Sequence, residues 1–307
     1  MQHASDAFVT VHGLGFTLPH GRVLFADLSF GLGHHRTGLV GANGVGKSTL
    51  ARILAGEVSP TRGRVVRSGR VSYLPQQRTD AGGGAGAQVP TVAHALGVAP
   101  QLAALRRIEE GSTDPVDYER AGTAWDLRER AQAELARLGL PHLALDRPLT
   151  SLSGGEATRV ALAGLGLGGP DLAILDEPTN DLDRDSREAL YRWVEAWRRG
   201  LLVISHDRAL LSLVDRIFDL SLQGLRVYGG NYAFYEEQRR AEDEAATRDL
   251  AHAKKELRRA ERAAQAARER QERRTSRGHR DRLSGSVPKV LIGARRDRAE
   301  GTTARLH

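Results

Sequence analysis

Residues 36–56 read RTGLVGANGVGKSTLARILAG, and this stretch decides the fold. Its first part, TGLV, has the apolar pattern of a buried strand, and KSTLARILAG has the apolar spacing of a helix. Between them, GANGVGKS matches G-x-x-x-x-G-K-[ST], a glycine loop that cradles phosphate groups when it joins a strand to a helix. The stretch therefore predicts an α/β fold with a phosphate site at the end of a strand.

The loop also supplies candidate ligands. Lys47 is the sole lysine in residues 1–235, a part of the chain with 25 basic residues. Its compact ammonium fits a tight loop that the broad guanidinium of arginine does not. The hydroxyl of Ser48 suits Mg²⁺. We expect nucleotide phosphates to be bound by Gly41, Asn43, Gly44, Gly46, Lys47, Ser48 and Thr49.

Two apolar runs, LAILDEP (172–178) and LLVISHD (201–207), are typical of buried parallel strands. With an amphipathic helix between them, they predict a doubly wound parallel sheet. Asp176 ends the first run and would hold Mg²⁺, and Glu177 would polarise an attacking water. The simpler interpretation of this pair is a charge cluster at a helix start.

Three further residues are candidates on weaker grounds. His206 follows the second run at the same expected sheet edge, where a γ-phosphate would lie, although a lone histidine is more often structural. Gln76 follows the strand VSYL and could contact both Mg²⁺ and water. Phe16 could stack on adenine, and a place in the core is as good an interpretation.

The sequence divides into two parts that differ in composition and in predicted secondary structure. Residues 1–235 would form one domain, with a helical subdomain over about 91–165. VVRSGRVSYLPQQ (65–77) predicts a strand pair with a turn at Ser68–Gly69.

Residues 236–307, the arm, contain 20 basic and 13 acidic residues, which is the whole net charge of +7. Helical patterning over 236–277 predicts a helix of about 60 Å, a break follows at RGHRDRLSGSVPK, and 290–307 begin a second helical stretch. A basic arm on a neutral domain favours a polyanion such as nucleic acid, or an anionic surface. The simpler interpretation is a solvated helix whose arginines keep it soluble.

Composition excludes some classes of function. There is no cysteine, which excludes disulfides and thiolate chemistry and fits a reducing cytoplasm. The start of the sequence lacks a signal-peptide pattern, and no run approaches the ~20 apolar residues that span a bilayer. We expect a cytoplasmic protein without a membrane segment of its own.

LSGGE (152–156) raises a separate question. Two glycines before a helix expose backbone N–H groups at its positive end, a surface that suits phosphate. The chain already has a complete phosphate loop about a hundred residues earlier. The residues alone leave open which nucleotide LSGGE contacts, and on which molecule.

Taken in order, these motifs resemble the ATP-binding cassette (ABC) ATPases over residues 8–235. The matches are GANGVGKST, the glutamine of YLPQQ, LSGGE, LAILDEP, the aspartate of NDLD and the histidine of ISHD. The resemblance implies a P-loop NTPase cassette, with ATP and Mg²⁺ as cofactors. It further implies that Ser153, Gly154 and Gly155 contact ATP held by an opposing cassette, with Asp183 along that interface.

The subtype resembles the ABC-F subfamily. The chain has DEPTNDLD where transporter ATPases commonly have DEPTSALD, and it adds ISHDR and YGGNYAFYEEQ. That resemblance implies a charged helical linker directed at the ribosome. The arm is similar to this linker. Both a translation factor and a protein that protects ribosomes against an antibiotic are compatible with it.

Members of ABC-F carry two cassettes, whereas G-x-x-x-x-G-K-[ST] occurs once in this sequence. We therefore expect the second cassette in trans, from a homodimer or another chain. The alternatives are an ATPase subunit that serves separate membrane subunits, and a non-catalytic fragment that binds ATP without hydrolysing it.

Overall fold

A computed structural model describes residues 7–76 and 89–283 of the chain. The chain forms two compact units, Met1–Gln238 and Arg239–His307. Of the helices in the described ranges, none combines the length and the apolar character that crossing a bilayer requires.

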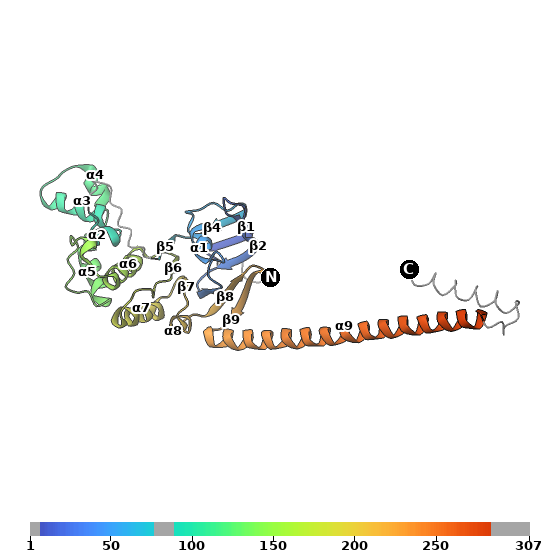
Figure 1. Cartoon of the computed structure of the whole chain (residues 1–307). Helices are drawn as coiled ribbons and strands as arrows, with labels where there is room; N and C mark the ends of the chain where they lie inside the picture. The colour runs from blue at the N-terminus through green and yellow to red at the C-terminus, as the bar shows by residue number, and fades with distance from the viewer. Residues whose placement is uncertain (1–6, 77–88, 284–307) are drawn as a thin grey trace. The chain divides into compact units, whose positions relative to one another are not determined.

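The first unit is built on a six-stranded sheet (Figure 1). Five strands are parallel, and the last one pairs antiparallel with its neighbour. In spatial order they are β5 (Val71–Leu74), β6 (Leu172–Asp176), β7 (Gly200–Ile204), β3 (Arg36–Val40), β8 (Arg216–Ser221) and β9 (Gly224–Gly229). The two strands expected from apolar runs are β6 and β7, and their parallel pairing is confirmed.

Both faces of this sheet are buried, as continuous apolar strands require. Alternate residues of β6 and β7 serve two different cores. Leu172, Ile174, Leu202 and Ile204 pack with helix α1 (Lys47–Ala55) and the first strands. Their neighbours along the strands, such as Leu175 and Val203, face the helical core described below.

A second sheet of three antiparallel strands was not expected. It has the order β2 (Val23–Leu32), β1 (Val9–Thr17) and β4 (Arg62–Arg67). The predicted strand pair over residues 65–77 is therefore wrong: β4 pairs with β1, and β5 pairs with β6. Just before β5, the Asp171 carboxylate accepts the N–H of Arg70 at 2.8 Å.

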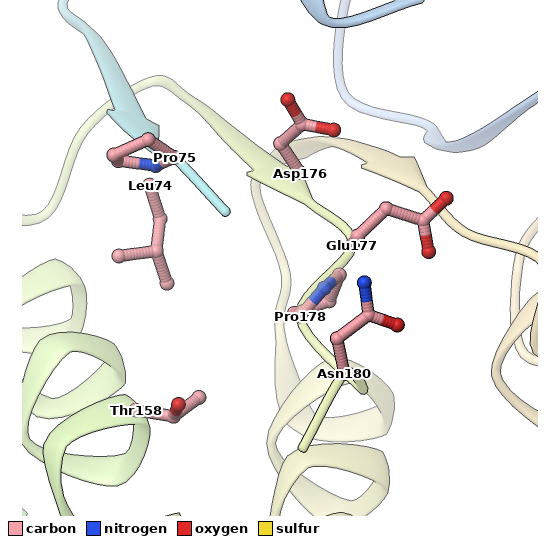
Figure 2. Close-up of a pocket in the computed structure, with 7 residues that line it drawn as sticks. All are labelled: Leu74, Pro75, Thr158, Asp176, Glu177, Pro178 and Asn180. Atoms are coloured by element: carbon pink, nitrogen blue, oxygen red, sulfur yellow. The ribbon is translucent and has the colours of Figure 1, made fainter. Parts of the chain in front are cut away.

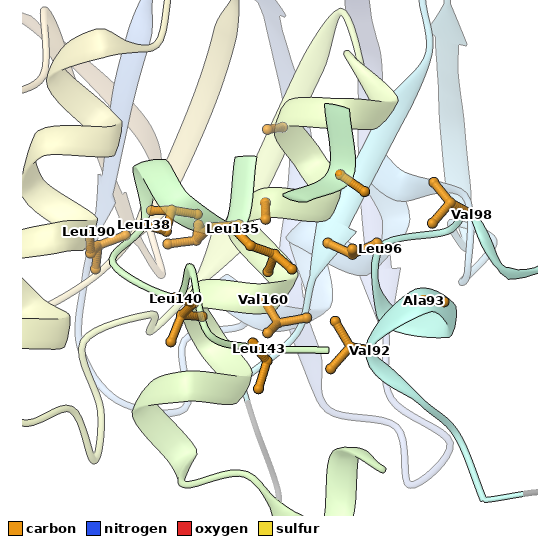
Figure 3. Close-up of a cluster of buried hydrophobic side chains, with 14 of the residues drawn as sticks. Val92, Ala93, Leu96, Val98, Leu135, Leu138, Leu140, Leu143, Val160 and Leu190 are labelled. Atoms are coloured by element: carbon orange, nitrogen blue, oxygen red, sulfur yellow. The ribbon is translucent and has the colours of Figure 1, made fainter. Parts of the chain in front are cut away.

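Helices fill the chain between β5 and β6. They are α2 (Val92–Ala95), α3 (Ala99–Glu109), α4 (Pro115–Ala121), α5 (Leu127–Arg137), the 3₁₀ turn η1 (Leu149–Ser151) and α6 (Gly154–Gly168). Val92, Leu135, Leu143 and Val160 form their buried core, which Leu190 joins from α7 (Arg184–Ala196) (Figure 3). This core continues onto the sheet, so the helices are packed firmly against the strands that end at the candidate site.

Helix α9 spans Tyr232–Leu283, 52 residues (Figure 1). It begins four residues before the predicted start at 236 and continues past Gly278 to Leu283, into the break predicted over RGHRDRLSGSVPK (277–289). A single glycine inside a helix costs about 1 kcal/mol relative to alanine, too little to end one of this length. Tyr235 in its first turn donates to the Asp219 carboxylate at 3.1 Å. The second helical stretch predicted at 290–307 lies outside the described residues.

Candidate nucleotide site

The glycine loop joins β3 to α1 with backbone geometry that requires glycine. Gly41 has a φ of +152°, and a Cβ there would lie 2.3 Å from the carbonyl oxygen of Leu220. Gly46, with a φ of 108°, is the N-cap of α1. The helix therefore begins at Lys47 with its N–H groups open to an anion. Asn43, Gly44 and Ser48 are exposed, and Thr49 is half-buried.

Lys47 is buried, and its ammonium turns back onto its own loop. Nζ donates to the carbonyl oxygens of Gly41 at 2.8 Å and Ala42 at 3.3 Å. Burial lowers the pKa of Lys47, while the carboxylates of Glu177 and Asp176 oppose that shift. The ammonium is thus held among weak ligands that phosphate oxygens would replace.

Lys47, Glu177 and His206 meet at the carboxyl end of the sheet. Nζ of Lys47 lies 3.3 Å from Nε2 of His206, which lies 3.5 Å from Oε1 of Glu177. Asp176 pairs with Ile204 in the β6–β7 register, so the residues after the two strands emerge side by side. Residues 159 positions apart in sequence thereby form one cluster.

Glu177 has the electrostatics of a proton acceptor. Its φ is +47°, and its N–H donates to the carbonyl oxygen of Ile204 at 2.8 Å. Burial raises the pKa of its carboxyl group, although His206 and Lys47 act in the opposite direction. A carboxylate with a raised pKa is a stronger base than an ordinary glutamate.

Asp176 is suited to a divalent cation. It is only 2% exposed. Its Oδ2 accepts the hydroxyl of Tyr73 at 3.0 Å, and its Oδ1 is buried without a hydrogen-bond partner in the described chain. In the described ranges, no group of three or more His, Cys, Asp or Glu side chains could hold a metal ion by itself. The Asp176 carboxylate with its open oxygen fits Mg²⁺, which binds through one or two carboxylates, waters and nucleotide phosphates. Ser48 would be its second protein ligand.

A pocket opens beside these carboxylates (Figure 2). Asp176 and Glu177 line it from the end of β6, and Thr158 lines it from α6. Leu74 and Pro75, at the end of β5, line the side next to Gln76, which is exposed. The pocket places the acidic end of β6 against the segment that leads to the predicted Gln76 contact.

LSGGE and Asp183 lie together. Ser153 and Glu156 form a capping box at the start of α6: the Ser153 N–H donates to Glu156 at 2.8 Å, and the Glu156 N–H donates to the Ser153 hydroxyl at 3.2 Å. Asp183 caps α7 by accepting the Ser186 N–H at 2.8 Å. Hydrogen bonding from Ser186 lowers the pKa of Asp183.

The two glycines of LSGGE differ. Gly155 is buried, and a Cβ on it would lie 2.4 Å from the Ser186 hydroxyl, so close packing on α7 requires this glycine. Gly154 is exposed with open space around it, which leaves its backbone accessible to a ligand. In the described chain no hydrogen bond or ion pair joins Ser153 or Asp183 to the Lys47 cluster. The predicted contact with an opposing ATP stays a prediction.

Phe16 lies in β1, partly buried, with its ring centroid 6.2 Å from that of Phe25. The Phe25 ring would be 3.1 Å from a Cβ on Gly46, so Phe16 is one side chain away from the glycine loop. Its adenine contact also stays a prediction.

Two tyrosines that donate hydrogen bonds to aspartates were not predicted from the sequence. Tyr73 contacts Asp176 as described above. Tyr191 on α7 donates to Asp207 at 2.5 Å, and burial together with this hydrogen bond raises its pKa to about 12. Asp207 in turn caps α8 (Arg208–Leu211), directly after His206. No sequence pattern indicates these tyrosine contacts. The Ser153–Glu156 capping box, in contrast, has a sequence signal, the S-x-x-E spacing of LSGGE.

Replacing Glu177 with glutamine should stabilise the nucleotide-free protein at neutral pH. The raised folded pKa means that the protonated form is favoured on folding, so stability is lost as pH rises through that pKa. Glutamine removes this loss. Urea unfolding should show Glu177→Gln more stable than wild type at pH 8, with the difference vanishing at pH 4. The exposed control Glu119→Gln should show no such trend. A less stable Glu177→Gln protein at pH 8 would contradict the burial argument.

Comparison with known proteins supports this geometry. The family described as ABC transporter matches residues 25–180. The chain is 35% identical over 271 residues to the tylosin resistance ATP-binding protein TlrC of Streptomyces fradiae, covering 79% of this chain and 48% of that protein. It is 31% identical over 225 residues to ABC transporter F family member 3 of Arabidopsis thaliana, covering 72% and 28%.

Among solved structures, a bacterial Atm1-family ABC exporter with ATP bound matches with a TM-score of 0.57 at 22% identity, covering 78% of this chain and 41% of that one. At that identity the likeness concerns the fold. The chain spans less than half the length of the curated relatives it matches. The family match covers the glycine loop, β6 and the Asp176–Glu177 pair, and we conclude that the chain belongs to the ABC transporter family and carries its ATP-binding cassette.

Proposed function

We propose that this chain is an ABC-F-like ATPase cassette that hydrolyses ATP and acts on the ribosome. The observation that carries the catalytic part is the meeting of Lys47, Glu177 and His206 within 3.5 Å at the end of the sheet. The basic arm and the two relatives named for tylosin resistance and for the F family support the ribosomal part.

In this proposal the phosphates of ATP lie on the N–H groups of the glycine loop, with Lys47 at the β and γ oxygens. Glu177 accepts a proton from a water molecule as the water oxygen bonds to the γ-phosphorus. The bond between the γ-phosphorus and the bridging oxygen breaks, which releases ADP. His206 binds the γ-phosphate. Ser48, Gln76 and Asp176 would hold Mg²⁺, which would neutralise phosphate charge.

LSGGE would act on another molecule. The accessible backbone of Gly154 and the positive end of α6 suit the γ-phosphate of ATP held by an opposing cassette. A second copy of this chain would supply the reciprocal contacts. Asp183, next to LSGGE, would lie along the same interface.

The arm would bind ribosomal RNA. Side chains in residues 240–273 of α9 are all exposed, and arginine recurs along them. Arginine forks match phosphate oxygens in two-pronged hydrogen bonds. Protection of ribosomes against an antibiotic and a general role in translation are both compatible with such an arm, and the tylosin resistance relative favours the former.

An ATPase subunit of a transporter is the second candidate, because the matching family is described as ABC transporter. Sedimentation of the chain with purified ribosomes in ATP supports the ribosomal proposal. Sedimentation with membranes instead would support the transporter subunit.

Nucleotide binding should depend on Lys47. Lys47→Ala removes a charge-assisted hydrogen bond to phosphate, so ATP affinity in a calorimetric titration should fall about tenfold or more. Lys47→Arg should not restore the affinity, because the guanidinium does not fit between the carbonyl oxygens of Gly41 and Ala42. The arm variant Lys254→Ala is the control and should bind like wild type. Equal affinities for all four proteins would remove Lys47 from the site.

Ribosome affinity should be electrostatic and depend on the arm. Replacing Arg258, Arg259 and Arg262 with glutamine should flatten the slope of log affinity against log salt concentration by about two to three, since each phosphate contact releases counterions. The control replaces Glu256, Glu261 and Glu269 with glutamine and should not flatten it. An affinity independent of salt would mean that the arm is only a solvated helix.

A further inference from the structure

Within residues 7–76 and 89–283, Tyr73 makes the one hydrogen bond to the side chain of Asp176. Its hydroxyl donates to Oδ2 at 3.0 Å, from strand β5 to the last residue of β6. The strands are parallel with Tyr73 paired to Ile174, so Tyr73 and Asp176 lie on the same face of the sheet. The ring is partly buried in the core on that face.

The two oxygens of Asp176 are therefore not equivalent. Oδ2 is taken by Tyr73, whereas Oδ1 is buried and has no hydrogen-bond partner in the described part of the chain. A buried acceptor without a hydrogen-bond partner destabilises the folded chain, and a cation at Oδ1 would supply the partner. Rotation of the carboxylate would exchange the two oxygens or move both away, and the bond from Tyr73 opposes that rotation.

We propose that Tyr73 is a positioning residue, which fixes the Asp176 carboxylate so that Oδ1 faces the divalent cation that arrives with the nucleotide. This inference rests on the nucleotide site of the proposed function. It requires neither hydrolysis nor the ribosome.

A phenylalanine at position 73 would retain the packing and lose the orientation. Mg²⁺ demands near-ideal octahedral geometry, whereas Ca²⁺ accepts irregular coordination at longer distances. Loss of a group that orients a ligand typically lowers metal affinity by 10–100-fold. Tyr73→Phe should therefore weaken the Mg²⁺ contribution more than the Ca²⁺ contribution, a change of selectivity that a space-filling role would not produce.

The test is the affinity of the full chain for AMP-PNP, a non-hydrolysable ATP analogue, in EDTA, in Mg²⁺ and in Ca²⁺. The ratio of the EDTA and metal dissociation constants measures how much each cation strengthens binding. In Tyr73→Phe we expect the Mg²⁺ ratio to fall about tenfold and the Ca²⁺ ratio to fall less, with unchanged affinity in EDTA. Tyr235→Phe is the matched control: it removes a tyrosine hydroxyl from a different carboxylate, Asp219, and should leave both ratios at their wild-type values.

Each other outcome overturns a distinct statement. Equal Mg²⁺ ratios in wild type and Tyr73→Phe would overturn the positioning role alone. An equal loss in EDTA, Mg²⁺ and Ca²⁺ would also overturn it, because it would assign Tyr73 to packing. A wild-type chain that does not bind AMP-PNP in any of the three solutions would overturn the proposed function itself, together with this inference.

Discussion

The parallel pairing of β3, β7 and β6 is the constraint on which the site depends. Thr37 pairs with Leu202, and Leu175 pairs with Val203, so all three strands end at one edge of the sheet. A shift by one residue would turn every side chain of a strand to the opposite face. Buried alternation on both faces prevents that shift, because β6 and β7 each contribute to two cores. The meeting of Lys47, Glu177 and His206 follows from this register.

The electrostatics of this edge follow from the same geometry. A buried ammonium and two carboxylates lie close together before any ligand arrives, and Lys47 is held by carbonyl oxygens and His206. Burial disfavours the charged form of Lys47 and of Glu177 alike. A phosphate would give the ammonium a stronger partner, and a cation would give Asp176 the partner its Oδ1 lacks. The Lys47 ammonium and the Asp176 carboxylate at this edge are thus complementary to a metal-bound nucleotide.

The sequence predicted the elements with strong local signals and missed contacts that depend on the folded sheet. The glycine loop, β6 and β7 are confirmed because their apolar runs and glycines act locally. The separation of β4 from β5 follows from their pairing with β1 and β6, strands distant in sequence, which no local pattern reveals. Tyr73 was hidden for the same reason, since only the β5–β6 register brings it to Asp176. The phosphate contact of LSGGE stays a prediction, whereas Gly155 is required by packing on Ser186.

The central claim is that LSGGE of a second cassette completes the ATP site at this edge. Light scattering of Glu177→Gln in ATP and Mg²⁺ tests it most directly, because glutamine keeps the shape of the side chain and cannot accept the proton from water. We predict that this variant accumulates as an ATP-dependent dimer, and that adding Ser153→Arg returns it to monomer by placing bulk and charge in the facing site. A Glu177→Gln protein that stays monomeric at every concentration, or a dimer that persists with Ser153→Arg, would contradict the account.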